Sequence, residues 1–343
     1  MITSKIGGGN SRCSNLELLR IVSMLLVLMI HFVPHHCIPS PESLSSETGT
    51  TLINLCLKSL SFVCVNCFIL ISGYFGIRWK FKSFLNLLFQ ILFWIFFGVG
   101  IAYFLNIRFE SSTADALIGF VNARWFIPAY LALYVIAPVV NAFIDKCSSM
   151  ELLRYLLIFY LFSTLFGYFL LSKEFNEGMS LISLIGIYIT GAYLKRDDSV
   201  FEQFGAKAAL VSYFLCALVL LIASLGLYSI GINKSIYGYL NPIVILQSIF
   251  LFLFFRNLKI KSKPVINFIA ASAFSVYLFH MHPLIIDSYG KVCKLLANNV
   301  WAVLTVPAFF IFLFAFCVVI DRFRIFIFHS VYKLVQHEST AGA

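Results

Sequence analysis

The sequence predicts an all-α integral membrane protein, a bundle of about ten transmembrane helices with both termini in the cytoplasm. Of its 343 residues, 61% are hydrophobic and 12% are charged, whereas a soluble chain carries about 25% charged residues. The apolar runs are continuous rather than alternating, which favours helices over an outer-membrane barrel. Basic residues also gather in alternate loops. This composition excludes a soluble enzyme, a disordered chain and a disulfide-stapled secreted domain.

Each transmembrane helix needs about 20 mostly apolar residues. The first apolar run is not a cleavable signal peptide, because Glu17 and Arg20 stand at its start and no small-residue cleavage site follows it. We expect one membrane domain over residues 1–343, with a core of about 14–325 between short polar tails. The ten predicted spans, of which the sixth is the shortest, are 17–34, 51–74, 84–105, 125–144, 151–171, 179–194, 206–228, 236–255, 265–286 and 298–320.

The distribution of positive charge sets the predicted orientation. The chain has 25 Lys and Arg residues and a net charge of +10. With the N-terminus inside, 18 of the 25 fall in inner segments, as the positive-inside rule requires. The charge therefore reflects topology, and no nucleic-acid partner is expected. The seven on the predicted outer side are Lys58, Arg108, Arg124, Lys173, Lys234, Lys291 and Lys294.

Two ionisable residues stand out in the first span, where charge is costly and therefore suggests function. Arg20 and His31 are 11 residues apart, which is three helical turns plus about 20°, so they share a helix face about 16 Å apart along the axis. Taken alone, Arg20 is interpreted as an interfacial anchor and His31 as a polar residue at a helix end. Together they are candidates for a functional pair.

The ninth span carries a second set of polar residues. Tyr277, His280 and His282 lie near its outer end, with His280 at a depth comparable to His31. His280 and His282 are two positions apart and point to different faces, so this helix does not form a two-histidine metal site. A site built from His31, His35 and one of these histidines stays open, but we expect no metal.

Two further segments at the predicted membrane faces are candidates for binding. On the inner side, Ser72 and Tyr74 end the second span and three cations follow, which suit a phosphate-bearing cofactor or lipid head groups equally well. On the outer side, the fourth span begins with a cation and an aromatic ring, typical of an interfacial anchor or of a substrate contact. These residues are Arg78, Lys80 and Lys82 inside, and Arg124 and Trp125 outside.

The nine cysteines carry less information. Cys64 and Cys67 form a CxxC inside an apolar run, without the soluble context of a redox motif, and we interpret them as packing residues. Cys37 and Cys293 both fall in predicted outer segments, and a disulfide between them is possible.

The sequence resembles the acyltransferase type 3 family of bacterial membrane O-acyltransferases over about residues 14–325. Four stretches carry the resemblance, in order along the chain: Arg20 with His31 ten residues beyond it, Phe68–Phe75 ending in Ser-Gly-Tyr-Phe, the segment from Trp125 to Asn141, and Ser275–His280. The basic pair that often follows the second span in this family is here replaced by three cations. Their correspondence to the family pattern is therefore loose.

The resemblance implies transfer of an acyl group, by expectation acetyl, from cytoplasmic acyl-coenzyme A to a hydroxyl of a surface or extracellular glycan or lipid-linked saccharide. It implies that Arg20 and His31 are essential, that acyl-CoA is a substrate with no cofactor bound permanently, and that the chain lies in the cell membrane among lipids. The extra esterase-like domain of some members is not found in this sequence. The acceptor and the oligomeric state stay open.

The residues permit such chemistry. A histidine titrates near neutrality, so neutral His31 can take the proton of an acceptor hydroxyl, with His280 as the main competitor for this role. Arg20 stays protonated and would hold a phosphate or the thioester end of the donor. The inner cations and Ser72–Tyr74 would bind the donor, and Arg124, Trp125, Tyr277 and His280 the acceptor. A secondary transporter or saccharide exporter, and a non-catalytic assembly subunit, are the alternatives; no interrupted helices or inverted repeats are evident in the sequence.

Overall fold

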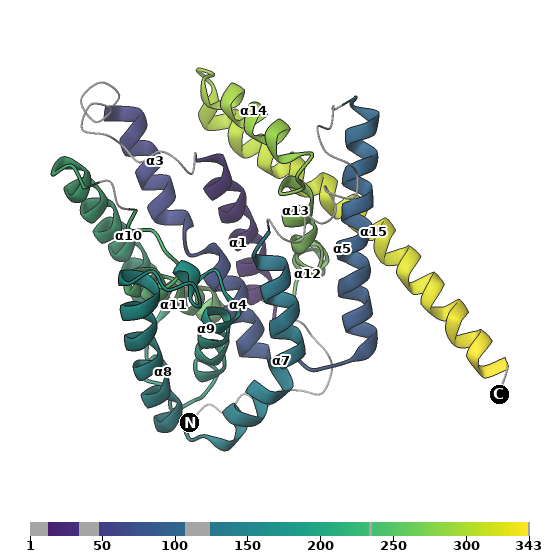
Figure 1. Cartoon of the computed structure of the whole chain (residues 1–343), viewed down its shortest axis with the longest axis horizontal. Coiled ribbons are helices and arrows are strands. Elements are labelled where there is room, and N and C mark those ends of the chain that lie inside the picture. Colours follow the sequence, from purple (N-terminus) through teal and green to yellow (C-terminus); the bar gives the residue numbers. More distant parts are fainter. Residues whose placement is uncertain (1–12, 34–47, 107–123, 233–234, 342–343) are drawn as a thin grey trace.

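The computed structural model describes residues 13–33, 48–106, 124–232 and 235–341. The protein is 78% helix, with no strand among these residues, which confirms the all-α class. Figure 1 shows the helices in a bundle from which the last helix extends at an angle. The helices are α1 (Ser14–Phe32), α3 (Thr48–Ser61), α4 (Cys64–Phe75), α5 (Phe81–Phe104), α7 (Phe126–Lys146), α8 (Ser149–Ser163), α9 (Leu181–Tyr193), α10 (Ala206–Ser229), α11 (Pro242–Asn257), α12 (Pro264–Ala270), α13 (Ala273–His280), α14 (Ile286–Ala297) and α15 (Ala302–Ala341).

Seven helical stretches in the described part of the chain are long and apolar enough to cross a membrane. In two of them the helix type or direction changes: α3 runs into α4, and α8 runs into the π-helix Thr164–Phe169. Three further apolar helices are shorter, namely α9, α11 and the stretch 264–280. All ten predicted apolar runs are therefore helical, but only seven have the length of a span. The protein is a multi-pass membrane protein, and the number of ten crossings stays a prediction.

Two of the predicted spans are interrupted. A turn at residues 62–63 separates α3 from α4, and another at residues 271–272 separates α12 from α13. These breaks could not be predicted from the sequence, because neither turn contains Pro or Gly. The predicted span 265–286 thus ends early: α13 stops at His280, and α14 begins only at Ile286. Both interruptions leave irregular backbone in the interior of the bundle.

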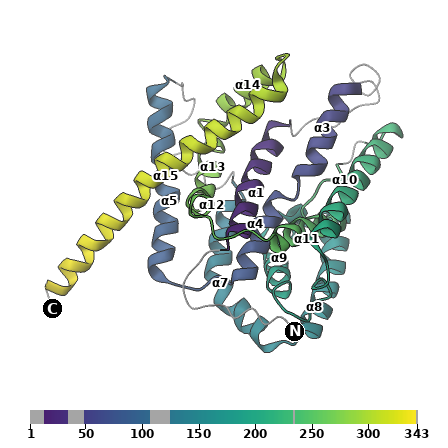
Figure 2. The same ribbon diagram turned by 180° about the vertical axis from the view of Figure 1, so that it is seen from behind.

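The tightest packing in the bundle joins α4 to α9, two helices that lie side by side in Figures 1 and 2. Two glycines make this approach possible. A Cβ atom on Gly73 would lie 1.9 Å from the carbonyl oxygen of Tyr188, and one on Gly191 would lie 2.2 Å from that of Leu70. Only a residue without a Cβ fits such a contact. The glycine of the Ser-Gly-Tyr-Phe stretch is therefore a packing residue.

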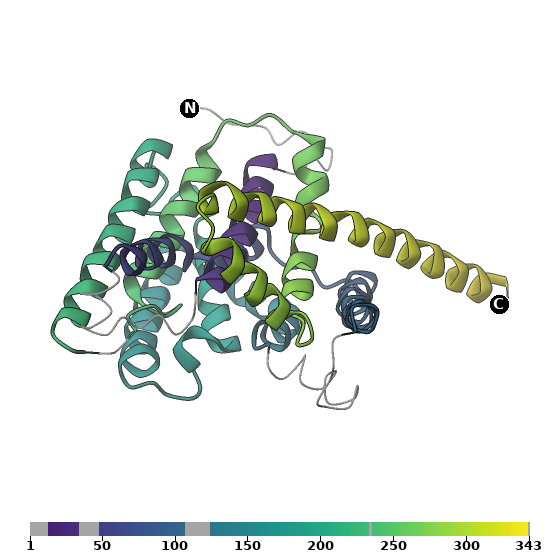
Figure 3. The ribbon, with the colours of Figure 1, turned by 90° about the horizontal axis from the view of Figure 1, so that it is seen from above.

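α5 lies at one edge of the molecule, where the last helix, α15, passes it (Figure 3), and both helices also pack against α13. A buried ion pair lies between them: Arg324 donates from Nε and Nη2 to the two carboxylate oxygens of Asp321, at 3.0 and 3.1 Å. Asn86, Gln90 and Trp94 of α5 complete the network. Arg324 is 2% exposed, so this cation of the predicted inner side is not an interfacial charge.

The C-terminal part differs most from the predicted spans. α14 is a short amphipathic helix next to the first turns of α15. α15 is 40 residues long, or about 60 Å, twice the thickness of the hydrocarbon core of about 30 Å. The predicted span 298–320 is only the first half of this helix. The start of α1 and the end of α15 lie toward the same side of the bundle (Figure 1).

Candidate functional site

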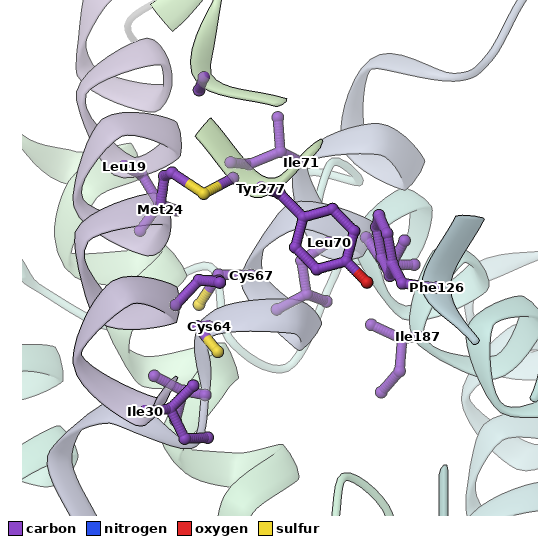
Figure 4. Packing of buried hydrophobic residues seen from close by; sticks show 14 of the residues in the cluster. Leu19, Met24, Ile30, Cys64, Cys67, Leu70, Ile71, Phe126, Ile187 and Tyr277 are labelled. Atoms are coloured by element: carbon purple, nitrogen blue, oxygen red, sulfur yellow. The ribbon is translucent and has the colours of Figure 1, made fainter. Parts of the chain in front are cut away.

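A cavity of about 250 Å³ lies in the bundle interior, where α1, α4 and the stretch α12–α13 meet. Both helix interruptions contribute: Cys64 and Val65 follow the first, and Ala270 and Ala271 begin the second. Figure 4 shows the side chains of α1 and α4 packed beside Tyr277 in this region. The polar and aromatic lining residues are Arg20, His31, Phe68, Ser72, Gln90, Arg124, Trp125, Phe126, Tyr130, Tyr239, Phe274 and Tyr277.

The cavity joins the two ionisable residues of α1. Arg20 is the seventh residue of α1 and His31 lies in its last turn, and both line the cavity. Arg20 forms an ion pair with Glu17, 3.3 Å from Nη1 to Oε2, and its side chain is 30% exposed against 8% for Glu17. A carboxylate three residues earlier on the helix thus orients the guanidinium without covering it. In the sequence, Glu17 counted only as evidence against a signal peptide, and its contact with Arg20 was not predicted.

His31 contacts the second candidate histidine directly. Its Nδ1 lies 3.0 Å from Nε2 of His280, and Nδ1 of His280 lies 2.6 Å from the carbonyl oxygen of Val276. A carbonyl only accepts, so Nδ1 of His280 carries a hydrogen. When both rings are neutral, Nε2 of His280 is then the acceptor and Nδ1 of His31 is the donor. The nitrogen of His31 that can take a proton is therefore Nε2.

The environments of the two histidines differ. His280 has no exposed surface, and its ring contacts those of Tyr277 and Tyr289 at 6.1 and 5.3 Å between centroids. His280 does not line the cavity, whereas His31 does. The expected contact of His280 with the acceptor stays a prediction; in the structure His280 contacts His31, which lines the cavity. His280 holds His31 in place.

His282 belongs to a different part of the structure. Its Nε2 lies 3.2 Å from the carbonyl oxygen of Ile95 in α5, and its Nδ1 accepts from the backbone N–H of Leu284 at 3.2 Å. The ring packs on Gly98, where a Cβ atom would lie 2.5 Å away. Thus His280 faces α1 and His282 faces α5. His282 links the turn after α13 to α5.

Aromatic rings form the wall of the cavity near the start of α7. Phe126 stacks on Tyr130 at 5.5 Å, and Phe274 stacks on Tyr277 at 6.0 Å. Trp125 lines the cavity and contacts Tyr239, at 5.5 Å between ring centroids. Trp125 and Tyr277, two residues expected to bind substrate, thus belong to one surface. Tyr239 could not be singled out in the sequence, because it comes from the short segment between α10 and α11.

Arg124 precedes α7 and also lines the cavity. Its Nε donates a hydrogen bond of 2.5 Å to the carbonyl oxygen of Met281, the residue that follows His280. This contact brings the start of α7 to the end of α13, although 157 residues separate them in the sequence. Arg124 is thus close to the histidine pair, and not an anchor at the surface of the bundle alone.

The inner basic segment lies apart from the cavity. Ser72 lines the cavity, but Tyr74, Arg78, Lys80 and Lys82 do not, and the three cations are exposed. Lys82 lies over the ring of Tyr332 at 4.4 Å. The sequence grouped these five residues as one binding set; the structure separates the serine from the rest.

A closed ring of hydrogen bonds fixes the backbone just before this segment. The N–H of Ile77 donates to the hydroxyl of Tyr188 at 2.7 Å, this hydroxyl donates to Oδ1 of Asn141 at 2.8 Å, and Nδ2 of Asn141 donates to the carbonyl oxygen of Ile77 at 2.9 Å. Asn141 is the last residue of the Trp125–Asn141 stretch quoted above. Its structural contribution is to hold the connection from α4 to α5.

The remaining predictions from the sequence concern the cysteines and a metal site. Cys64 and Cys67 are fully buried in the core, in agreement with a packing role. No group of three His, Cys, Asp or Glu side chains in the described part of the chain could hold a metal ion. His35 and Cys37 lie outside the described residues. The metal site and the disulfide to Cys293 that involve them therefore stay untested.

A bundle of membrane-length helices around an internal cavity with a histidine and arginines defines a membrane protein with a buried polar site. A family model described as "Acyltransferase domain", of the acyltransferase type 3 family, matches residues 14–322. The chain belongs to this family, which confirms the resemblance. Neither a comparison with curated proteins nor one with solved structures found a match.

Proposed function

We propose that the protein is a membrane O-acyltransferase that moves an acetyl group from cytoplasmic acetyl-CoA to a hydroxyl of a surface or extracellular glycan, or of a lipid-linked saccharide. The observation that carries the proposal is the arrangement of α1: His31 and Arg20 line one cavity, and His31 is held by His280. Membership of the acyltransferase family supports the class of reaction. The site of action would be the inner membrane of the cell.

In this proposal His31 is the general base. The acceptor oxygen attacks the thioester carbonyl carbon while its proton passes to Nε2 of His31. The hydrogen bond from Nδ1 of His31 to His280 stabilises the imidazolium that forms, since a charged donor makes a stronger hydrogen bond. The C–S bond then breaks, and the thiolate of coenzyme A takes the proton back from His31. The products are the acyl ester and free coenzyme A.

The donor would approach from the inner side. A cavity of about 250 Å³ is smaller than the range of about 300–1,000 Å³ usual for a drug-sized ligand, so the nucleotide would remain outside it. The exposed cations Arg78, Lys80 and Lys82 suit the phosphates. Arg20 would then hold the donor's arm at the inner end of the cavity, beside Ser72. Tyr74 does not line the cavity, and its ring contacts that of Phe252.

The acceptor would approach His31 from the side of α7. The rings of Trp125 and Tyr277 offer apolar faces to a sugar ring, and Arg124 offers donors to its polar groups. The interrupted helices are a feature that transporters share, so an exporter is the second candidate. Coenzyme A release separates the two, because only the enzyme forms this product.

The experiment is acyl transfer by the purified protein in lipid nanodiscs, followed by mass spectrometry of the acceptor and by release of coenzyme A. His31→Ala should lower transfer by about 10²–10⁴-fold, the usual effect of losing a positioned base. His329→Ala is the matched control, because His329 is exposed on α15 and does not line the cavity. Unchanged transfer by His31→Ala, with a normal thermal melt, would refute the role of His31.

A further inference from the structure

Arg124 differs in its partners from the three arginines of the described chain that form ion pairs. Arg20, Arg256 and Arg324 each have a carboxylate within 4 Å, from Glu17, Glu202 and Asp321. Among the described residues, Arg124 has no carboxylate within 4 Å; the exposed Asp287 acts on it only at longer range, and its one hydrogen bond runs from Nε to the Met281 carbonyl. The two terminal nitrogens of its guanidinium, with four N–H donors, are not engaged by described residues.

The position of Arg124 makes this charge costly without an anion. It is half-buried, and it lines a cavity whose neighbouring surface is built from the rings of Trp125, Phe126 and Tyr277. A cation in apolar surroundings is unfavourable unless it is paired. It also lies at the N-terminal end of the 21-residue helix α7, where the helix dipole adds positive potential. Both features favour a bound anionic group.

The chemistry of the group limits what that anion can be. A guanidinium held at Nε presents its remaining donors as a planar fork, which matches the oxygens of a carboxylate or a phosphate. The anchor at Met281 places this fork beside the residue that follows His280, and His280 contacts His31 at 3.0 Å. An anion bound there would lie close to the hydroxyl that reacts.

We propose that the acceptor carries a negative charge, a carboxylate or a phosphate, near the acylated hydroxyl, and that Arg124 binds it. The acceptor is thus an acidic saccharide or a phosphate-linked saccharide rather than a neutral one. This inference rests on the proposed acyltransferase function. It adds the charge of the substrate, which that function does not require.

The test compares neutral and charged acceptors built on the same sugar ring. Purified protein in nanodiscs receives acetyl-CoA with methyl glucoside, methyl glucuronide or glucose 1-phosphate, and kcat/KM is measured for each. The wild type should prefer at least one charged acceptor by about 10-fold or more, in line with a hydrogen bond to a charged group. Arg124→Gln should remove the preference, while Arg124→Lys should keep part of it and thereby show that a folded variant retains the site.

Controls separate a specific contact from a general effect of charge. Lys294→Gln removes a cation on the same predicted side, exposed on α14 and away from the cavity, and should leave the preference unchanged. Glu110→Gln with Asp115→Asn removes the acids of the preceding segment. A preference that appears only in this double variant would mean that these acids are the partner of Arg124, and would overturn the proposal.

The remaining outcomes are equally decisive. Equal use of neutral and charged acceptors by the wild type, or a preference that survives Arg124→Gln, would overturn the inference but leave the acyltransferase function standing. Transfer to no acceptor, with no release of coenzyme A, would refute the function itself. An effect of Arg124→Gln that depends on anionic lipid in the nanodisc, and not on the acceptor, would assign Arg124 to lipid head groups.

Discussion

His31 and His280 are two residues whose surroundings differ in the structure. Both are histidines at similar depth, so the sequence left them as competitors for one role. In the structure only His31 reaches the cavity, and His280 is buried between His31 and a backbone carbonyl. Such a chain fixes the tautomer and the orientation of the outer ring, as second-layer partners do for other functional histidines. His280 is therefore a positioning residue in the proposed mechanism.

We predict that His280→Ala lowers kcat, with little change in KM for acetyl-CoA. The decrease should be smaller than that of His31→Ala, for which loss of the base predicts about 10²–10⁴-fold. His280→Gln should restore part of the activity, because its amide oxygen can accept from Nδ1 of His31. Steady-state kinetics of the three proteins, with thermal melts, check this. If His31→Ala retains near-normal transfer while His280→Ala abolishes it, the two roles are reversed.

At the residue scale, some contacts of the candidate site could be predicted from the sequence and others could not. The spacing of Arg20 and His31 predicted their common face, since a helix repeats every 3.6 residues. The contact of His31 with His280 spans 249 positions, and no periodicity of either helix predicts it. Glu17 could have been found, because acid and arginine three residues apart on a helix are neighbours. Gln90 could not, since its place beside the cavity depends on Asp321 from α15.

At the scale of elements, close contact between α4 and α9 depends on Gly73. We predict that Gly73→Ala destabilises the protein by about 1–3 kcal/mol, the usual effect of overpacking, because the added Cβ would meet the Tyr188 carbonyl. Gly100→Ala is the control: Gly100 lies in α5 with nothing within 4 Å of an added Cβ. That change should be neutral or stabilising. Equal melting temperatures for the two variants would contradict the packing role of Gly73.

The segment between α4 and α5 carries the second prediction at this scale. We expect that changing Arg78, Lys80 and Lys82 to Gln raises KM for acetyl-CoA more than it changes kcat, because exposed cations bind phosphate without touching the reacting atoms. Lys259, Lys261 and Lys263 are a matched control with the same charge on the same predicted side. An equal rise of KM in both triple variants would indicate an effect of surface potential alone. If KM did not rise, the segment between α4 and α5 would only set the orientation of the protein in the membrane.

At the scale of the whole molecule, composition predicted the class, and ten apolar runs predicted ten helical regions, all of which are present. Their breaks and lengths were not predictable. The interruptions at 62–63 and 271–272 lack Pro and Gly, so they arise from packing in the bundle. The long α15 exceeds its apolar run because Asp321 and Arg324 satisfy each other against α5. In the sequence, a charged pair at the end of an apolar run indicates the end of a span, although the helix continues through it.

The orientation of the molecule supplies the last prediction. An 18-to-7 distribution of basic residues favours both termini in the cytoplasm. The start of α1 and the end of α15 lie toward one side of the bundle (Figure 1), as an even number of crossings requires. A fluorescent reporter fused after Ala343 should be active inside the cell. A phosphatase fused after Asn298, between α14 and α15, should be active outside.

These two fusions test the short helices as well as the orientation. α9 has 13 residues and spans about 20 Å, less than the hydrocarbon core of about 30 Å, so it crosses only if the bundle or the bilayer covers its ends. If α9 did not cross, every later segment would change sides. The phosphatase fused after Asn298 would then lie in the cytoplasm and be inactive. The reporter after Ala343 would lie outside the cell and would not fluoresce as expected for a cytoplasmic C-terminus. The segment 106–124 is the other place where a crossing could have been missed, and a fusion after Lys146 distinguishes the two, because it precedes α9.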